Sequence, residues 1–274
     1  MGCAPAARAP AGEMAPVTIG VSIDIGEKTY PGRAGVRAVT ALRNLQARID
    51  PSEFCVITGP SGCGKTTLLN IVAGLDRDFA GTLGFAPPDR GAPCIGYVFQ
   101  TPRLLPWRTV RENVELVRPR RADRMELEGL LSDVGVADMA DAYPAQLSGG
   151  MARRAALARA FAIAPDLLLM DEPFLSLDAA AADRLRSLLL RLVSSRPATV
   201  LFVTHDLAEA VELADRILVL SPAPGRVVAE MPIDLPRKER RDPVMLSALR
   251  TELARLADHP IEPPENNENS ILTA

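Results

Sequence analysis

The sequence predicts an α/β protein whose core is a largely parallel β-sheet, and two observations lead to that prediction. Short apolar runs alternate along the chain with stretches of helical periodicity, the pattern of strands joined by crossover helices. The runs are nearly continuous in apolar residues, as expected for strands buried on both faces. They lie at 54–59, 95–100, 167–171, 199–204 and 216–221.

The composition is that of a soluble globular protein. The 274 residues are 47% hydrophobic and 24% charged, which allows a sizeable core. The formal net charge of −3 gives no general attraction to nucleic acid, so no nucleic-acid partner is expected. Two basic runs, at 118–124 and 237–241, are interpreted as solvated faces, with proximity to lipid headgroups as the alternative.

The sequence places the protein inside the cell. It has no charge-free run of the roughly 18 residues that a membrane span needs. Residues 1–16 lack the apolar segment of a secretory signal, and the four cysteines have no metal-ligand spacing, which favours a reducing cytoplasm. Residues 1–16 and 259–274 are aperiodic and rich in Pro, Ala, Asn and Glu, and are predicted to be disordered tails.

Residues 103–163 differ from the surrounding sequence, because they show helical periods and many alanines but few strand signals. We therefore expect a helical subdomain inserted into the α/β core. One of its helices is predicted to bury an apolar face made by Met125, Leu127, Leu130, Leu131 and Val134.

A phosphate-binding motif, GPSGCGKTT, follows the run 54–59 and precedes a helical stretch, as the pattern G-x-x-x-x-G-K-[ST] requires. Glycines let backbone N–H groups turn inward, and the helix start adds a positive dipole, so the loop is predicted to cradle phosphates. A glycine-rich turn before a helix is the alternative. The motif consists of Gly59, Pro60, Ser61, Gly62, Cys63, Gly64, Lys65, Thr66 and Thr67.

Within this motif, Lys65 is expected to reach the β- and γ-phosphates, and the Thr66 hydroxyl to bind Mg²⁺. The run LLLMDEP would supply the other half of the site, because Asp171 ends a buried strand at the carboxyl edge of the sheet. Asp171 is expected to be a direct or water-mediated partner of Mg²⁺, and Glu172 to orient and deprotonate the attacking water.

A second glycine-containing helix start occurs in LSGGMARRAALARA. Here Ser148, Gly149 and Gly150 precede an alanine-rich helix and offer bare backbone donors, which predicts another anion site. One nucleotide has no obvious way to use both sites of one chain, so the second site is expected to serve another subunit's nucleotide. At these residues the sequence resembles the ATP-binding subunits of ABC transporters, whose signature is LSGG followed by Gln or a variant.

The resemblance extends from about Val17 to Ser221, and further motifs follow in the family's order. It implies that Tyr30 stacks on adenine, that Gln100 is the Q-loop glutamine and a Mg²⁺ partner, and that Asp178 belongs to the D-loop. His205 would be the switch histidine that contacts the γ-phosphate. The structural alternatives are that Tyr30 is a tyrosine packed in a turn and that His205 is a capping residue.

The resemblance implies a P-loop NTPase with a RecA-like core, an antiparallel β subdomain and the inserted helical subdomain. It also implies a head-to-tail homodimer with two ATP molecules, each between residues 59–67 of one chain and 148–150 of the other. Glu172 would act as base, with Lys65, His205 and Gln100 completing the catalytic site. The implied domains are an ABC ATPase domain at 17–235, with the helical subdomain at about 103–163, and a C-terminal helix at 236–258.

The loop after Gln100 contains Trp107, which is the only tryptophan, in an apolar stretch with arginines on both sides. In transporter ATPases this junction receives a short coupling helix of the permease. The resemblance therefore implies that a transmembrane permease docks near Gln100–Trp107. The alternative is that Leu104, Leu105 and Trp107 pack the subdomain junction.

The motifs LLPW, LSGGM and LVLSPAPGRV together resemble the nitrate/sulfonate/taurine importer branch. This implies a peripheral ATPase on the cytoplasmic face of the inner membrane that drives solute import, with an extracytoplasmic solute-binding protein acting indirectly. A non-transport ABC ATPase, a mechanical or regulatory module of the division type, is the alternative. The intact Lys65, Asp171, Glu172 and His205 argue against an inactive subunit.

Overall fold

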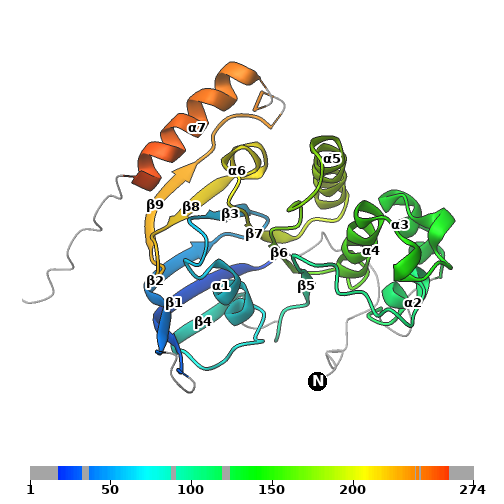
Figure 1. The fold of residues 1–274 in the computed structure, drawn as a ribbon, viewed down its shortest axis with the longest axis horizontal. Coiled ribbons are helices and arrows are strands. Elements are labelled where there is room, and N and C mark those ends of the chain that lie inside the picture. Colours follow the sequence, from blue (N-terminus) through cyan, green and yellow to red (C-terminus); the bar gives the residue numbers. More distant parts are fainter. Residues whose placement is uncertain are drawn as a thin grey trace, which may run out of the picture.

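The five apolar runs predicted as strands lie side by side in one sheet of a computed structural model of the chain (Figure 1). The parallel sheet expected from the sequence is thereby confirmed. Strand β9 pairs antiparallel with β8, the strand before it in the chain, and forms one edge of the sheet. In the order β5-β6-β7-β3-β8-β9, the strands are Ile95–Val98, Leu167–Asp171, Thr199–Val203, Phe54–Thr58, Arg216–Leu220 and Val227–Pro232.

The structure describes residues 18–32, 37–87, 91–118, 124–237, 239–240 and 242–258. The tails predicted at 1–16 and 259–274 lie outside these ranges. Within the described ranges, no helix is long and apolar enough to cross a bilayer.

A second sheet consists of three antiparallel strands in the order β2-β1-β4, with bounds Val39–Ile49, Gly20–Tyr30 and Ala80–Ala86. It lies at the lower left of Figure 1, and helix α1 (Lys65–Val72) runs in front of it. Along β1, buried and exposed residues alternate, so one face is apolar. That face, which includes Ile23 and Ile25, packs in one cluster with Leu68 of α1 and Ile57 of β3. The cluster fixes both ends of the segment that holds the phosphate motif.

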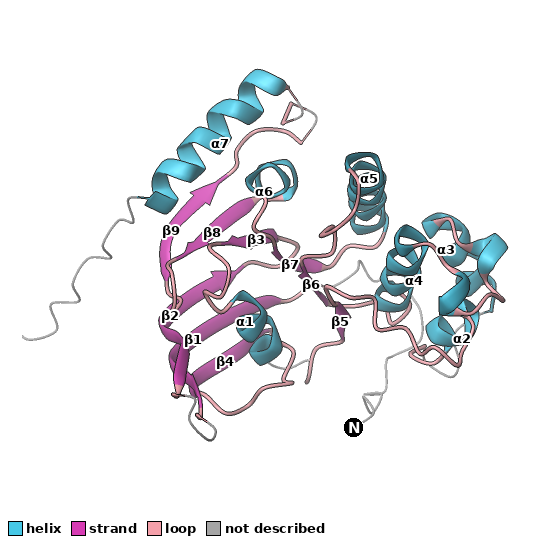
Figure 2. Cartoon of the chain, viewed as in Figure 1, coloured by secondary structure: helices cyan, strands magenta, loops and turns pink. Residues whose placement is uncertain are grey.

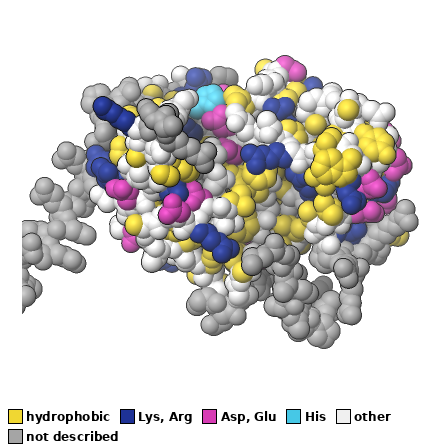
Figure 3. Space-filling model, turned by 60° about the horizontal axis from the view of Figure 1, so that its bottom comes forward, with side chains coloured by type: hydrophobic (Ala, Val, Ile, Leu, Met, Phe, Trp, Pro, Cys, Tyr) yellow, Lys and Arg dark blue, Asp and Glu magenta, His cyan; other side chains and the backbone are white. Residues whose placement is uncertain are grey.

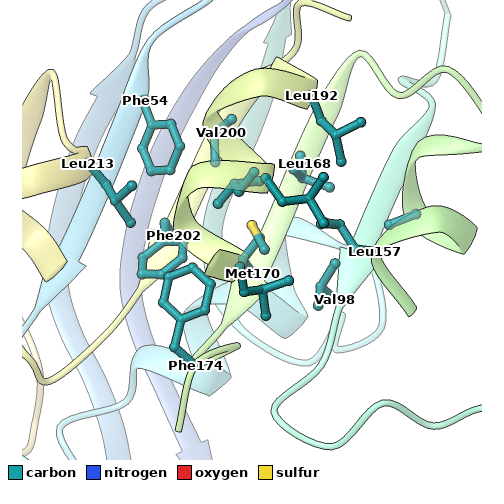
Figure 4. Close-up of a cluster of buried hydrophobic side chains, with 14 of the residues drawn as sticks. Phe54, Val98, Leu157, Leu168, Met170, Phe174, Leu192, Val200, Phe202 and Leu213 are labelled. Carbon is teal, nitrogen blue, oxygen red and sulfur yellow. The ribbon is translucent and has the colours of Figure 1, made fainter. Parts of the chain in front are cut away.

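The other side of the six-stranded sheet is covered by α4 (Gly149–Phe161), α5 (Ala179–Ser195) and α6 (Leu207–Leu213). Figure 4 shows the side chains of this second cluster between the strands and the helices. The ring of Phe202 on β7 lies 5.9 Å from that of Phe54 and 5.4 Å from that of Phe174. Aromatic packing therefore holds the segment after β6 against the sheet.

The inserted helices form the right-hand part of the molecule (Figure 2). They are α2 (Val110–Glu115) and α3 (Arg124–Val134), followed by the short 3₁₀ turns η2 (Ala137–Met139) and η3 (Pro144–Gln146). The boundary of about 103–163 stays a prediction. Leu127, Leu130, Leu131 and Val134 are buried as expected, but Met125 is 79% exposed, so its predicted burial was wrong. Met125 is two positions from Leu127, and about 200° of helix rotation carries it to the opposite face.

The C-terminal helix α7 spans Pro243–Asp258 and packs on α6 and β9. The segment before it corrects one expectation, because Arg240 of the basic run 237–241 is buried rather than solvated. Its guanidinium donates to the carbonyl oxygens of Leu235, at 2.7 Å, and Ile233, at 3.1 Å. These two carbonyls follow the end of β9, and the arginine supplies hydrogen-bond donors to both.

Candidate nucleotide-binding site

The phosphate motif forms a tight loop between β3 and α1. The helix begins at Lys65, directly after Gly64, whose φ is +101°. A Cβ on Gly64 would lie 2.5 Å from Cδ2 of Leu42 and 2.8 Å from the Ala41 carbonyl oxygen. Both the backbone angle and the packing against β2 therefore demand glycine at this helix start.

Lys65 is buried beneath the loop, with 6% exposure. Its ammonium donates to the carbonyl oxygens of Gly59, at 2.7 Å, and Pro60, at 3.0 Å. Cys63 is also buried, with its Sγ 3.8 Å from Nζ of Lys65. Burial raises the pKa of the Cys63 thiol, although the nearby ammonium partly opposes the shift. The cation therefore lies inside the loop that the sequence predicts to hold phosphates, while Ser61 and Gly62 are exposed on its rim.

Thr66 and Asp171 meet across the gap between α1 and the end of β6. The Thr66 hydroxyl donates to Oδ1 of Asp171 over 3.2 Å. Asp171 is 5% exposed, and this burial raises its pKa, against the opposing effects of Thr66 and Lys65. A hydroxyl beside a carboxylate is a hard oxygen pair that fits Mg²⁺, which takes one or two carboxylates together with phosphates. The described residues hold no group of three or more Asp, Glu, His or Cys side chains that could bind a metal ion without such phosphates.

Glu172 and His205 are brought together from the ends of neighbouring strands. Oε2 of Glu172 lies 3.1 Å from Nδ1 of His205. Glu172 has a positive φ of 43°, a strained backbone conformation for a residue with a side chain, and its N–H donates to the Val203 carbonyl. The N-cap of α6 is Asp206, not His205, which removes the capping role considered for the histidine.

A cavity of about 400 Å³ lies between the Thr66–Asp171 pair and the loop after β5, and neither Glu172 nor His205 lines it. Gln100 lies in its wall together with Thr66 and Asp171. Sequence reasoning missed Arg103, whose guanidinium carbon lies 4.1 Å above the ring of Phe99. The cavity is lined by Thr66, Asn70, Leu75, Asp76, Tyr97, Phe99, Gln100, Thr101, Arg103 and Asp171.

Tyr30 lies at the end of β1, close to the first turn of α1. Its phenolic oxygen is 3.2 Å from Oγ1 of Thr67 and donates to Oδ2 of Asp76 over the same distance. The side chain keeps 39% of its surface exposed, so it is not packed into the core. This leaves an open aromatic surface beside the phosphate loop.

The second helix start lies apart from the first. Ser148 caps α4 by accepting a hydrogen bond from the Met151 N–H at 3.3 Å, and Gly149 follows at the exposed surface. Gly150 and Asp178 line the same cavity of about 500 Å³, where Asp178 caps α5. Among the residues that the structure describes, none lines both this cavity and the one at the phosphate loop. One chain therefore carries two separate cavities, one at each of the helix starts that the sequence predicts to bind anions.

Arginines of α4 connect its helix to the loops of the first site, and sequence reasoning missed both. Arg159 donates to the carbonyl oxygens of Pro102, at 3.0 Å, and Arg103, at 2.8 Å. Arg153 donates to the Pro173 carbonyl at 3.0 Å and also to the carbonyl of Leu175. No local sequence signal could have identified them, because their partners lie far away in the chain.

The loop that contains Trp107 is held from beneath by Asn113 of α2, which is fully buried. Its amide accepts from the Leu105 N–H at 2.7 Å and donates to the carbonyls of Leu105 and Arg108. Leu104 packs against the core, as one alternative proposed, but Trp107 is 69% exposed. Figure 3 shows hydrophobic side chains gathered over the right-hand part of one face, the side where α2 and α3 lie in Figure 1.

Comparisons with known proteins agree with this geometry. The model of the ABC transporter family matches residues 42–175. An aliphatic sulfonates import ATP-binding protein, SsuB 2 of Burkholderia cenocepacia, is 43% identical over 262 residues, covering 94% of this chain and 92% of the relative. A protein of the same description, SsuB 1 from Pseudomonas aeruginosa, is 46% identical over 219 residues, covering 77% and 88%.

A solved structure has the same fold. The ATP-binding cassette MJ0796, in a dimeric post-hydrolysis state bound to ADP and Pi, is 32% identical, with a TM-score of 0.66. The match covers 78% of this chain and 99% of that one. These findings confirm the fold class, the family resemblance and the enzyme class predicted from the sequence. The chain belongs to the ABC transporter family, as an ATPase subunit similar to the ATP-binding proteins of aliphatic sulfonate import.

Proposed function

We propose that this chain hydrolyses ATP at the cytoplasmic face of the inner membrane and thereby drives import of an aliphatic sulfonate through a permease. The observation that supports it best is the meeting of the Thr66–Asp171 pair with the Glu172–His205 pair beside the phosphate loop. The sulfonate class is supported by the relatives, whose names specify aliphatic sulfonate import. The sequence motifs also suggested nitrate and taurine, of which taurine is itself an amino-substituted aliphatic sulfonate.

The nucleotide is proposed to bind with its phosphates on the loop 59–67 and its adenine on Tyr30. Backbone N–H groups of the loop and the dipole of α1 would hold the phosphates. Lys65 would leave the carbonyls of Gly59 and Pro60 and donate to the β- and γ-phosphates instead. Its present position, buried below the loop, keeps the ammonium close to where the phosphates would lie.

Thr66, Asp171 and Gln100 are proposed to hold Mg²⁺, whose charge would offset that of the phosphates during transfer. Glu172 would accept a proton from the attacking water, and its contact with His205 would fix the carboxylate. His205, which is half exposed, would donate from its free ring nitrogen toward the γ-phosphate. The hydrogen bond from the Glu172 N–H to the Val203 carbonyl holds this residue at the sheet edge despite its strained backbone.

A second copy of the chain is proposed to complete the site. Ser148, Gly149 and Gly150 would bind the γ-phosphate of the partner's nucleotide, and Asp178 would lie beside it. The separation of the two cavities within one chain supports this pairing. Catalysis would then require closure of two chains, because each donates only part of the phosphate contacts.

Glu172→Gln tests the catalytic assignment. The amide cannot take up the proton of water, so hydrolysis should fall by about 100-fold or more, while ATP still binds. We expect this variant to accumulate as an ATP-bound dimer in size-exclusion chromatography. Glu252→Gln, which alters an exposed acid on α7, is the control and should hydrolyse ATP normally. A Glu172→Gln variant that remains monomeric in saturating ATP and Mg²⁺ would contradict the paired arrangement.

The permease is proposed to dock at the loop Gln100–Trp107, in which Trp107 is exposed and the backbone of Leu105 is held by Asn113. Trp107→Ala should leave basal ATPase activity and thermal stability unchanged but weaken retention of the permease in gently solubilised membranes. Met125→Ala removes another exposed apolar side chain of the same region and should retain the permease. Loss of activity and stability together in Trp107→Ala would favour the junction-packing alternative.

The partner and solute can be identified in one series. The tagged chain is extracted with mild detergent, and the proteins that remain bound are identified by mass. A polytopic membrane protein would support the transporter assignment. Its complex, reconstituted with the binding protein, should show ATPase activity stimulated by an unsubstituted alkanesulfonate more than by nitrate or by taurine, which is an amino-substituted sulfonate. A partner of the cell-division machinery would instead favour the mechanical-module alternative.

A further inference from the structure

Lys28 on β1 is buried, with 3% exposure, although it lies outside the phosphate loop. Its ammonium donates to Oδ1 of Asp76 at 2.9 Å and to the Asp78 carbonyl oxygen at 2.6 Å. Burial by itself would lower the pKa of Lys28, but the hydrogen bond and charge of Asp76 outweigh it and raise that pKa. The lysine is therefore charged and tied to the loop between α1 and β4.

The same ion pair holds Tyr30 at two points. Tyr30 is two residues beyond Lys28 on the same strand, so both side chains project to one side. Nζ of Lys28 lies 4.6 Å from the centroid of the Tyr30 ring, within the range of a cation–π contact. The Tyr30 hydroxyl donates to Oδ2 of Asp76, whose other oxygen accepts from Lys28.

We infer that Lys28 and Asp76 are positioning residues that hold the Tyr30 ring ready for the nucleotide base. This rests on the proposed stacking of adenine on Tyr30. A tyrosine with 39% of its surface exposed would otherwise sample several rotamers, and ordering it upon binding would reduce affinity. The lysine contacts the face of the ring, and the aspartate fixes its hydroxyl. Both the position of the ring and its orientation are therefore set before the base binds.

The inference makes a prediction that separates the base from the phosphates. ATP would contact both Tyr30 and the loop 59–67, whereas inorganic tripolyphosphate would contact the loop alone. Loss of the ring's support should therefore weaken binding of the nucleotide and leave binding of tripolyphosphate unchanged. A general disturbance of the fold would weaken both ligands together.

The experiment is calorimetric titration of the full-length chain with Mg²⁺ and either adenylyl imidodiphosphate or tripolyphosphate. Lys28→Met should weaken nucleotide binding by about 3- to 10-fold, and Lys28→Arg should restore most of it. Arg43→Met is the matched control, because it breaks an exposed ion pair with Glu27 in the same sheet. It should bind both ligands as the wild type does.

A second variant guards against misfolding, because Lys28→Met alone leaves the Asp76 carboxylate without its cation. Lys28→Met combined with Asp76→Asn removes one positive and one negative charge, so the net charge is unchanged. This double variant should show the same selective loss of nucleotide binding. An equal loss for both ligands, or no loss for either, would overturn the inference. If Tyr30→Ala binds nucleotide normally, the base assignment fails and the inference fails with it. If only Tyr30→Ala weakens binding, the inference alone is wrong.

Discussion

The two glycine-containing helix starts of this protein look alike in sequence and differ in what surrounds them. At α1, a side chain on Gly64 would collide with Leu42 and the Ala41 carbonyl, and the φ of +101° disfavours any other residue. At α4, a side chain on Gly150 would meet nothing within 4 Å. The first glycine is required by the fold itself. The second leaves open space at the start of α4, which the proposed approach of a partner's phosphates would require.

Gly64→Ala should have the largest effect on the isolated chain. Backbone strain and the clash with Leu42 should lower the free energy of unfolding by about 2 kcal/mol or more and abolish nucleotide binding. Urea unfolding monitored by circular dichroism measures the loss. Gly74→Ala is the control, because its φ is +69° but the space around it is open. It should cost about 1 kcal/mol from strain alone. Equal losses of unfolding free energy in both variants would show that the packing around Gly64 adds nothing to the backbone strain.

Gly150→Asp should affect hydrolysis without affecting folding. The new carboxylate has room and lies in the first turn of α4, where the helix dipole favours it, so thermal stability should not fall. It would repel the partner's phosphates, and ATPase activity should drop by about 100-fold while ATP affinity of the monomer is unchanged. Gly129→Asp on α3, also in open space, is the control and should be fully active. An active Gly150→Asp would show that the bare surface serves no phosphate.

Asp171→Asn should produce a smaller change, and in the opposite direction. Burial raises the pKa of Asp171, which means that the charged form destabilises the native state. The variant should raise the free energy of unfolding by about 1 kcal/mol without Mg²⁺, and it should lose Mg²⁺-dependent ATP binding. The gain should shrink as the pH falls through the raised native-state pKa, because the wild-type carboxyl then takes up a proton. A gain that is independent of pH would contradict burial of the charge as its cause.

Part of the fold and of the site was predictable because its signals are local. The buried strands, the phosphate motif and Asp171 are each encoded within a few consecutive residues. The strand β1 was not recognised from its residue pattern, since its apolar face alternates with polar residues and only the family resemblance implied it. Asn113 and Lys28 were missed for a different reason. Each gains its role from backbone or side chains that only the tertiary structure brings near.

The exposure of Trp107 has a consequence for spectroscopy. Because this is the only tryptophan in the chain, essentially all indole emission originates from one loop, and 69% exposure places that emission in a polar environment. Burial of the ring against a membrane protein would shift the spectrum to the blue and reduce quenching by iodide. The protein therefore carries a natural fluorescent reporter at the surface where its partner is proposed to dock.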